Sequence, residues 1–426
     1  MRRERGSSSS LAASAPASAA DKQSEFAKIV SHYLEGILDK SDGIPELEIR
    51  FGTRGNSPTT REHFDGVIQK LLSSGFTIEK KNGYSLKIQN EFIDQKTGQT
   101  KLSLIRAEIH GINDIQNYCK TNTPDEKYVL FTQKMYAKTG SGSGSGGDTI
   151  HPVIFDDFNF KVSFQREKHI ANTSTLARSI LKSWNDNKKT FRYINRTTLK
   201  HPEFPFQIDM SVVKESHKDQ TGYISASTFD AARVLESPIR YEMEIEVVND
   251  LVGPGTAFNH PKHLMDNLRK MIKIVMSGIQ GTNYPVSGSE IRSIQQRYYE
   301  LLYPGDTRES EDEGEGEDEG KQADRARASR VVELRPKHFI GPNSYTLQMH
   351  NIRPLDTDSK VPNIRMNYSV TEKADGTRKL LFIAPKTGHV YLIDTNMNVQ
   401  FTGAVSLNPK LHNTLLDGEH VLHDKS

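Results

Sequence analysis

The sequence predicts an α+β protein in which a closed antiparallel β-barrel with flanking helices precedes a second, smaller α+β domain. Three observations lead to this prediction: most segments in the first part resemble strands, two of these strands alternate glutamate with apolar residues, and an acidic glycine-rich stretch divides the chain. Many strands with few interrupting helices are typical of a barrel, since closure leaves no unpaired sheet edge.

Composition sets the outer limits of the prediction. The chain has 426 residues, enough for two or three domains, and 35% of them are hydrophobic. The net charge is +2 and the mean hydropathy is −0.62. A single cysteine, Cys119, excludes an internal disulfide framework and fits a reducing compartment. We find no run of about 18 apolar residues, so we predict no membrane span.

Apolar periodicity locates the individual elements. In the first helix, Phe26, Ile29 and Val30 recur at helical spacing, whereas strands show alternation with a period of two. Helices are predicted at 21–40, 59–72, 173–186, 261–278 and 289–302. Strands are predicted at 46–52, 77–81, 84–94, 100–109, 127–137, 158–169, 190–199, 205–214 and 238–249.

Composition shifts predict the domain boundaries. Residues 1–20 are rich in Arg, Ser and Ala and lack large apolar residues after Leu11, which favours a disordered tail over an amphipathic targeting signal. The barrel domain is predicted at 21–304. The acidic, glycine-rich stretch 305–330 has too few apolar residues to fold and is predicted to be a disordered linker. The second domain is predicted at 331–426.

Two strands carry glutamates on one face. In ELEIRFG, Glu46, Glu48 and Arg50 share a side, because residues i and i+2 of a strand point the same way. In RYEMEIEVV, Glu242, Glu244 and Glu246 do the same. Either strand alone is explained by a water-facing surface. Three like charges in a row are an unfavourable use of such a surface, so the two strands together indicate a cation site.

Basic residues follow the same alternation on the strands between these two. If the sheet closes, acids and cations face one lumen, and such a lumen suits a polyphosphate chain with a metal ion. Taken singly, each cation is equally well explained as a surface or salt-bridge residue. The candidates are Arg106, Lys134, Arg166, Lys168, Arg192 and Arg196, with Asp209 and Ser211 in the segment FQIDMS.

The paired glutamate strands of residues 40–250 resemble the triphosphate tunnel metalloenzymes, in the form found in RNA triphosphatases of fungal, poxvirus and giant-virus capping enzymes. The resemblance implies that Glu46, Glu48 and Glu246 hold Mg²⁺ or Mn²⁺. It implies that Glu242 and Glu244 support the metal or the attacking water. The implied phosphate-binding group is Arg50, Arg106, Lys134, Arg166, Lys168, Arg192, Arg196 and Asp209. Relatives often have a basic residue where Gln207 stands, so one phosphate contact is missing unless Arg196 or Lys200 replaces it.

A second constellation lies near the end of the sequence. YSVTEKADGTRKLLFI places Lys373, Asp375, Gly376 and Arg378 between two predicted strands, and LLDGEHV follows about 45 residues later. By itself, Asp-Gly is a common hairpin turn. The two motifs in this order and at this spacing resemble the covalent nucleotidyltransferases, which include capping guanylyltransferases and polynucleotide ligases.

This second resemblance implies a lysine nucleophile that attacks the α-phosphate of a nucleotide and forms a phosphoramidate. Lys373 takes that role, Arg378 contacts the sugar or phosphate, and Glu419 contacts the sugar or supports a metal. Glu372, Asp375 and Gly376 complete the implied nucleotide site. Further motifs of such enzymes are expected after Ser426. We therefore expect the segment given to hydrolyse RNA triphosphates without completing nucleotide transfer.

Together the motifs predict a viral-type mRNA capping enzyme that removes the γ-phosphate of RNA 5′-triphosphate ends. Its second domain, incomplete here, is expected to take part in GMP transfer. Its expected partners are triphosphate-ended RNA, GTP and a methyltransferase domain or subunit, without a membrane. Its expected location is the host cytoplasm, at the viral factory, or the virion. Two alternatives stay open: a tunnel polyphosphatase fused to a polynucleotide ligase, and a non-catalytic barrel that binds RNA or a partner.

Overall fold

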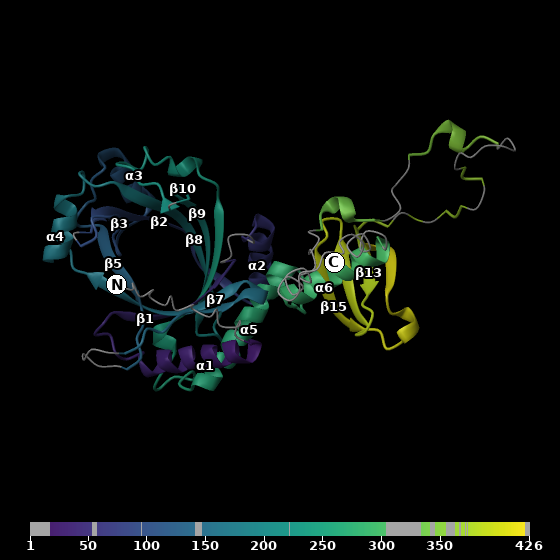
Figure 1. Ribbon diagram of the computed structural model, residues 1–426, viewed down its shortest axis with the longest axis horizontal. Helices are drawn as coiled ribbons and strands as arrows, with labels where there is room; N and C mark the ends of the chain where they lie inside the picture. The colour runs from purple at the N-terminus through teal and green to yellow at the C-terminus, as the bar shows by residue number, and fades with distance from the viewer. Residues whose placement is uncertain are drawn as a thin grey trace, which may run out of the picture. The chain divides into compact units, whose positions relative to one another are not determined.

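The computed structural model divides into two compact units, Met1–Ile279 and Gln280–Ser426, which we describe separately (Figure 1). It describes residues 18–52, 58–94, 96–140, 147–220, 222–303, 334–340, 346–354, 363–365, 368–370, 372 and 374–421. Most of the predicted tail at 1–20, the predicted linker at 305–330 and the predicted nucleophile Lys373 lie outside these residues.

Eight strands of the described chain close into an antiparallel barrel, which confirms the predicted fold class. Each strand pairs with the next, and β1 returns to β7, so both edges of the sheet are paired. In order around the barrel the strands are β1 (Ile44–Phe51), β12 (Arg240–Val247), β9 (Phe206–Glu215), β8 (Lys189–Lys200), β2 (Thr77–Ile93), β4 (Ile105–His110), β5 (Val129–Tyr136) and β7 (Phe160–Ile170). Short strands β3 (Thr100–Leu102) and β6 (Val153–Phe155) extend the sheet, and β10 (Lys218–Asp219) pairs with β11 (Gly222–Tyr223).

Helices cover the outside of the barrel because alternate strand residues are apolar. Leu47, Ile49 and Phe51 on β1 belong to a buried core that also takes in residues of α1 (Ala19–Glu35), α2 (Arg61–Ser73) and α5 (Pro261–Gln280). A second core joins β2, β4, β5 and β8 to α3 (Ile112–Thr121) and α4 (Thr175–Lys182). The apolar residues of these strands are committed to the outer face, so their polar neighbours face the lumen.

The predicted elements differ from the observed ones at several places in this unit. The two predicted strands at 77–81 and 84–94 form the single strand β2, with register shifts against β8. The predicted strand 100–109 is divided into β3 and β4. Helix α3 was not predicted; its ten-residue sequence INDIQNYCKT is short and buries only Ile115 and Tyr118.

Helices α2 and α5 cross at two glycines. A Cβ atom on Gly278 would lie 2.6 Å from Cα of Val67, and one on Gly66 would lie 2.7 Å from the carbonyl oxygen of Gly278. We expect Gly278→Ala to lower the free energy of unfolding by about 1–3 kcal/mol, because the added methyl group forces the helices apart. Urea denaturation would measure the change, with the exposed Lys270→Ala on the same helix as control. An unchanged midpoint for Gly278→Ala would contradict this packing.

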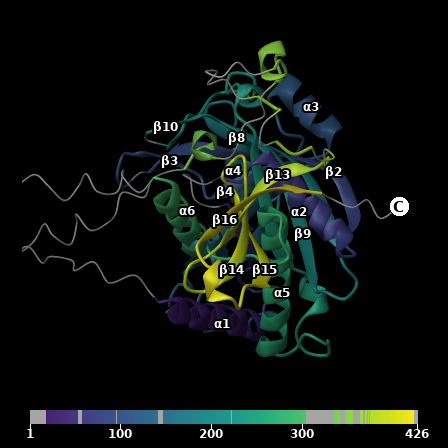
Figure 2. The same ribbon diagram turned by 90° about the vertical axis from the view of Figure 1, so that its right-hand side faces the viewer.

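The second unit is built on a four-stranded antiparallel sheet (Figure 2). Its order is β15 (Val399–Val405), β14 (His389–Asp394), β13 (Thr377–Ile383) and β16 (Thr414–His420). Helix α6 (Gly288–Leu302), which the sequence analysis placed with the barrel domain, buries Ile294 and Tyr298 in the core of this sheet. Tyr391 on β14 donates a 2.7 Å hydrogen bond to Glu290 of the same helix.

Among the described residues, no helix combines the length and the apolarity that a membrane-spanning helix requires.

Candidate functional site: a charged barrel lumen

The barrel encloses a cavity of about 540 Å³ lined mostly by charged and polar side chains. β1 and β12 contribute the glutamates Glu46, Glu48, Glu244 and Glu246, and the other strands contribute most of the cations together with some further carboxylates. Most of these side chains come from residues that alternate with the outward apolar residues of the same strand. The period-two pattern therefore places charges from distant parts of the sequence in one enclosed space.

Glu244 is held by two arginines. In the register of β1 and β12, Arg50 stands opposite Glu244 and hydrogen-bonds it, and Arg196 lies 3.4 Å away. Burial by itself would raise the pKa of Glu244, but these two guanidinium groups outweigh it and lower the pKa to about 2. Glu242 on the same face pairs with Arg192 and lies 3.5 Å from Arg50. Both glutamates therefore hold arginines in place.

Glu46 and Glu48 share the ammonium group of Lys134. Its Nζ lies 2.5 Å from Oε2 of Glu46 and 3.7 Å from Oε2 of Glu48, and Ser163 donates a 3.1 Å hydrogen bond to Glu48. Although Glu46 Oε2 is in this ion pair, it is buried and accepts no well-aligned hydrogen bond. Burial, together with Glu167 and Glu48 and despite Lys134, raises the pKa of the Glu46 carboxyl.

Glu246 stands opposite Glu48 across the β1–β12 pair, and among the described residues its side-chain hydrogen-bond partner is the neutral Gln207. The side-chain amide of Gln207 donates a 2.9 Å hydrogen bond to Oε2 of Glu246. Burial and the negative charges of Glu46 and Asp209 raise the pKa of Glu246 to about 7. Gln207 is neutral at the point where a basic residue was expected, and the nearby charge of Lys134 does not outweigh the burial of Glu246.

The three predicted metal ligands, Glu46, Glu48 and Glu246, all line the lumen. Within the described residues, no three His, Cys, Asp or Glu side chains are already arranged around one point as metal ligands. Lys134 supplies the positive charge near two of them instead. The donor set nevertheless suits a divalent cation, because oxygen atoms of buried, mutually repelling carboxylates are the ligands that Mg²⁺ and Mn²⁺ prefer.

Asp209 fixes Arg196 in the wall of the lumen. Its two carboxylate oxygens accept hydrogen bonds from Arg196 at 2.7 Å and Thr198 at 2.6 Å. Arg196 also donates to Ser211 at 3.1 Å. Burial, only partly offset by Arg196, raises the pKa of Asp209. The predicted grouping of Asp209 with the phosphate ligands is therefore corrected: an anion repels phosphate, and its effect on a substrate passes through Arg196.

Of the predicted cations, Arg50, Arg106, Lys134, Arg192 and Arg196 line the lumen. Arg106 has no carboxylate within ion-pair distance among the described residues. Sequence reasoning missed Lys87 and Lys161, which also line it. Lys87 lies 3.2 Å from Glu108, which accepts a 2.8 Å hydrogen bond from Thr132, and burial lowers the pKa of Lys87 despite that partner.

Arg166 and Lys168 do not face the lumen. On β7 the apolar residues Phe160, Val162 and Phe164 belong to the outer core, so the even-numbered positions point outward. Arg166 donates hydrogen bonds to three backbone carbonyl groups, those of Asp39 at 2.6 Å and of Gly36 and Gly43 at 3.2 Å. The odd positions Lys161, Gln165, Glu167 and His169 line the cavity instead.

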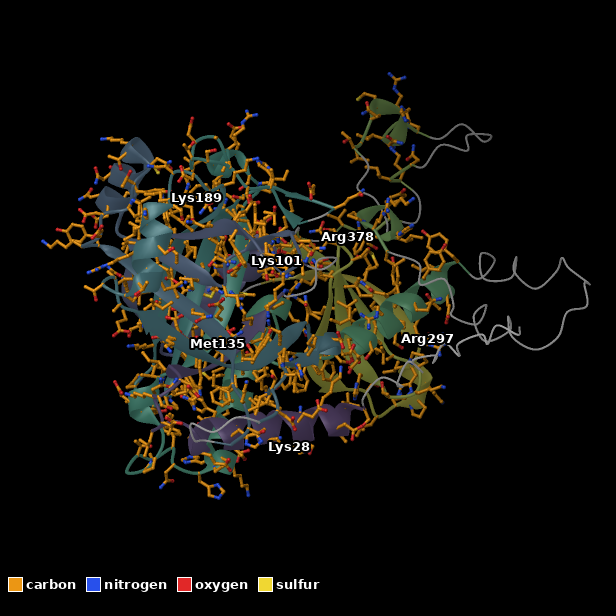
Figure 3. The ribbon with its side chains drawn as sticks, turned by 60° about the vertical axis from the view of Figure 1, so that its left-hand side comes forward. Lys28, Lys101, Met135, Lys189, Arg297 and Arg378 are labelled. Carbon is orange, nitrogen blue, oxygen red and sulfur yellow. The ribbon has the colours of Figure 1, made fainter. Side chains whose placement is uncertain are left out.

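In the second unit, the described members of the nucleotide motifs meet at the β13–β16 pair. Arg378 is labelled in Figure 3. It stands opposite Glu419 in the strand register and forms two hydrogen bonds with Asp417, at 3.0 and 2.8 Å. A Cβ atom on Gly376 would lie 2.5 Å from the carbonyl oxygen of His420, so glycine is required there. Glu372, Asp375 and Glu419 are exposed. Arg378, which was predicted to contact a nucleotide, is therefore held by Asp417, a carboxylate of the LLDGEHV motif.

Comparisons with known proteins find similarity to capping enzymes. Residues 313–426 match the family model described as the catalytic domain of mRNA capping enzyme. Over 189 residues the chain is 23% identical to a probable mRNA-capping enzyme of Acanthamoeba polyphaga mimivirus. That alignment covers 44% of this chain and 12% of the relative, so the chain spans a small part of the relative's length.

Two solved structures are similar to the chain at low identity. The mimivirus capping enzyme triphosphatase is 16% identical, with a TM-score of 0.34 over 59% of this chain and 96% of that one. The S. pombe Pct1 RNA triphosphatase is 13% identical, with a TM-score of 0.32 over 58% of this chain and 91% of that one. The assignment of the barrel rests on its own strand pairing and side-chain contacts.

Proposed function

We propose that this chain, a relative of viral mRNA capping enzymes, removes the γ-phosphate from RNA 5′-triphosphate ends inside the barrel. The observation that carries the proposal is the distribution of charge in the lumen. Glu46, Glu48 and Glu246 line the lumen together with the cations Arg50, Arg106, Lys134, Lys161, Arg192 and Arg196, among further charged and polar side chains. A triphosphate tail carries several negative charges, so it requires an enclosed site with both a metal ion and fixed cations.

Glu46, Glu48 and Glu246 are the residues that would hold Mg²⁺ or Mn²⁺. The bound ion supplies Lewis-acid stabilisation of the charge on a phosphoryl oxygen. The raised pKa values of Glu46 and Glu246 support this assignment, because burial and neighbouring carboxylates outweigh the nearby charge of Lys134 in both residues. A bound cation would therefore stabilise their ionised forms.

The chain's own cations would bind and orient the phosphates. Arg106 and Lys161 line the lumen without a carboxylate partner in the described part of the chain, so their charge is available to a substrate. Arg196 is fixed by Asp209 and Glu244 at a defined place in the wall. Holding the terminal phosphoryl group in line with a water molecule, and neutralising its charge, is most of what phosphoryl transfer requires.

Release of labelled phosphate tests this proposal. The chain would be incubated with RNA that carries a γ-labelled 5′-triphosphate, in Mg²⁺, in Mn²⁺ and in excess chelator. We expect inorganic phosphate and a 5′-diphosphate RNA end with either metal, and neither product with chelator. If a folded protein released no phosphate with either metal, the barrel would be a non-catalytic domain that binds RNA or a partner.

For the second unit we propose a part in GMP transfer, with Lys373 as the nucleophile. The match of residues 313–426 to the capping catalytic model and the Arg378–Asp417–Glu419 group support this role. In a protein that contains the whole catalytic domain, labelled GTP should give a covalent adduct that is lost in Lys373→Ala and kept in Lys386→Ala. An adduct with ATP alone would assign the unit to the ligases.

Triphosphate removal followed by GMP transfer would place the protein in mRNA cap synthesis. Triphosphate-ended RNA and GTP would then be its substrates, and a methyltransferase domain or subunit would act next. We propose the host cytoplasm, at the viral factory, or the virion as the location where such an enzyme acts.

A further inference from the structure

A cluster of side chains centred on Glu215 has no part in the chemistry proposed above. Glu215 is the last residue of β9, lines the lumen and is only 8% exposed. Its carboxylate accepts hydrogen bonds from Arg240 at 2.6 Å and from the Tyr223 hydroxyl at 2.8 Å. Lys218 lies 3.4 Å from it, and Arg192 lies 3.9 Å from it on the side of the lumen.

The cations of this cluster become more exposed with distance from the lumen. The side chain of Arg192 is 29% exposed, that of Lys218 is 46% exposed and that of Arg240 is 51% exposed. Burial alone would raise the pKa of Glu215, but Tyr223 and the surrounding cations outweigh it and lower the pKa. Glu215 therefore stays an anion and holds a row of positive charges that leads from the lumen to the surface.

A short hairpin adds an aromatic ring to this row. Strands β10 and β11 pair Lys218 with Tyr223, and the Lys218 ammonium lies 4.2 Å from the centre of the Tyr223 ring. Tyr223 lines the cavity and remains partly exposed. Along β9, Glu215 lies six residues beyond Asp209, on the order of 20 Å of extended strand. The ring therefore stands away from the proposed metal carboxylates, at a mouth where the cavity reaches the surface.

We propose that Tyr223, Lys218 and Arg240 form an RNA-binding rim at this mouth, which contacts the first nucleotides of a single strand. The inference rests on the proposed triphosphatase activity and adds the basis of its preference for RNA. A partly exposed aromatic ring beside cations is the arrangement on which unpaired bases stack while their phosphates are neutralised. Inorganic tripolyphosphate fits the lumen but has no nucleotide that could contact the rim.

Kinetics with two substrates test the rim. Triphosphate-ended RNA of about ten nucleotides and inorganic tripolyphosphate would be compared for wild type, Tyr223→Ala, Tyr223→Phe and Lys218→Ala. We expect Tyr223→Ala to raise KM for RNA by about fivefold or more, since a stacking contact is lost, with kcat nearly unchanged. Tyr223→Phe keeps the ring and should retain the wild-type KM. Lys218→Ala should reduce the salt dependence of RNA binding by about one phosphate contact.

The chain offers a matched control in a second Lys–Tyr pair. Lys127 lies 5.1 Å from the ring centre of Tyr128, which is exposed and has no link to Glu215. Tyr128→Ala should leave both substrates unaffected. Equal losses on RNA and tripolyphosphate in Tyr223→Ala, or an unchanged KM for RNA, would overturn the rim. If the wild type cleaves neither substrate, the triphosphatase proposal itself fails, and the rim with it.

Discussion

Replacing Glu246 with glutamine is expected to abolish metal-dependent phosphate release while the barrel stays folded. The change removes a proposed metal ligand, and loss of one such charge in a phosphoryl-transfer site costs at least about a hundredfold in rate. It keeps the shape of the side chain and its position beside Gln207. Phosphate release from triphosphate-ended RNA with Mn²⁺ would measure the loss.

Thermal unfolding distinguishes this result from simple damage to the fold. The pKa of Glu246 is raised to about 7, mainly by burial, so the metal-free fold loses stability as the pH rises from the usual glutamate pKa towards that value, and the loss is complete above it. At pH 8 the metal-free glutamine variant should therefore be at least as stable as wild type. Adding Mn²⁺ should raise the Tm of wild type and of the exposed control Glu236→Gln, but not that of Glu246→Gln. A variant that keeps its metal-dependent rate would refute the ligand assignment.

Replacing Arg106 with glutamine is expected to cost about a hundred- to a thousandfold in kcat/KM, because a cation that faces the phosphates is lost. No carboxylate in the described chain pairs with Arg106, so its removal leaves no buried charge without a partner. The Tm should accordingly change little. Steady-state kinetics on triphosphate-ended RNA and a thermal melt would measure both quantities.

Lys168→Gln is the matched comparison for Arg106→Gln. Both residues were predicted to bind phosphate from the same alternation of charge. Lys168 lies on the outward face of β7, so its replacement should leave kcat/KM within about twofold, as expected for a surface position. A large loss of activity in Lys168→Gln would show that the face of β7 is assigned wrongly.

The strand alternation allowed the acidic part of the site to be predicted but left one strand ambiguous. On β1 and β12 the glutamates alternate with large apolar residues, so their common face follows from the sequence. On β7 the segment QREKH has charges on both faces. Only the earlier apolar residues Phe160, Val162 and Phe164 show which positions of this strand face outward. Extending that phase forward would have assigned Lys161 to the lumen and excluded Arg166.

Other features of the site depend on three-dimensional contacts that no local pattern contains. Lys87 was overlooked because the lone cation in YSLKIQN gives no charge pattern, although Leu86 and Ile88 fix its face. The separate effects of Gln207 on Glu246 and of Asp209 on Arg196 arise across strand pairs. Helix α6 has an amphipathic sequence that fits either unit equally well, and only its packing on the second sheet places it.

The pairing of β1 with both β7 and β12 has a consequence for how the protein is made. Roughly 200 residues separate Glu48 from its cross-strand partner Glu246, so the carboxylate cluster cannot assemble until the strand carrying Glu246 has left the ribosome. Contacts between such distant segments make folding slow, because a large loop must close before they contribute. Until then β1 is an unpaired edge, and its row of acidic side chains disfavours pairing with other nascent chains. The same glutamates would thus protect the chain during synthesis before they take up their role in the finished barrel.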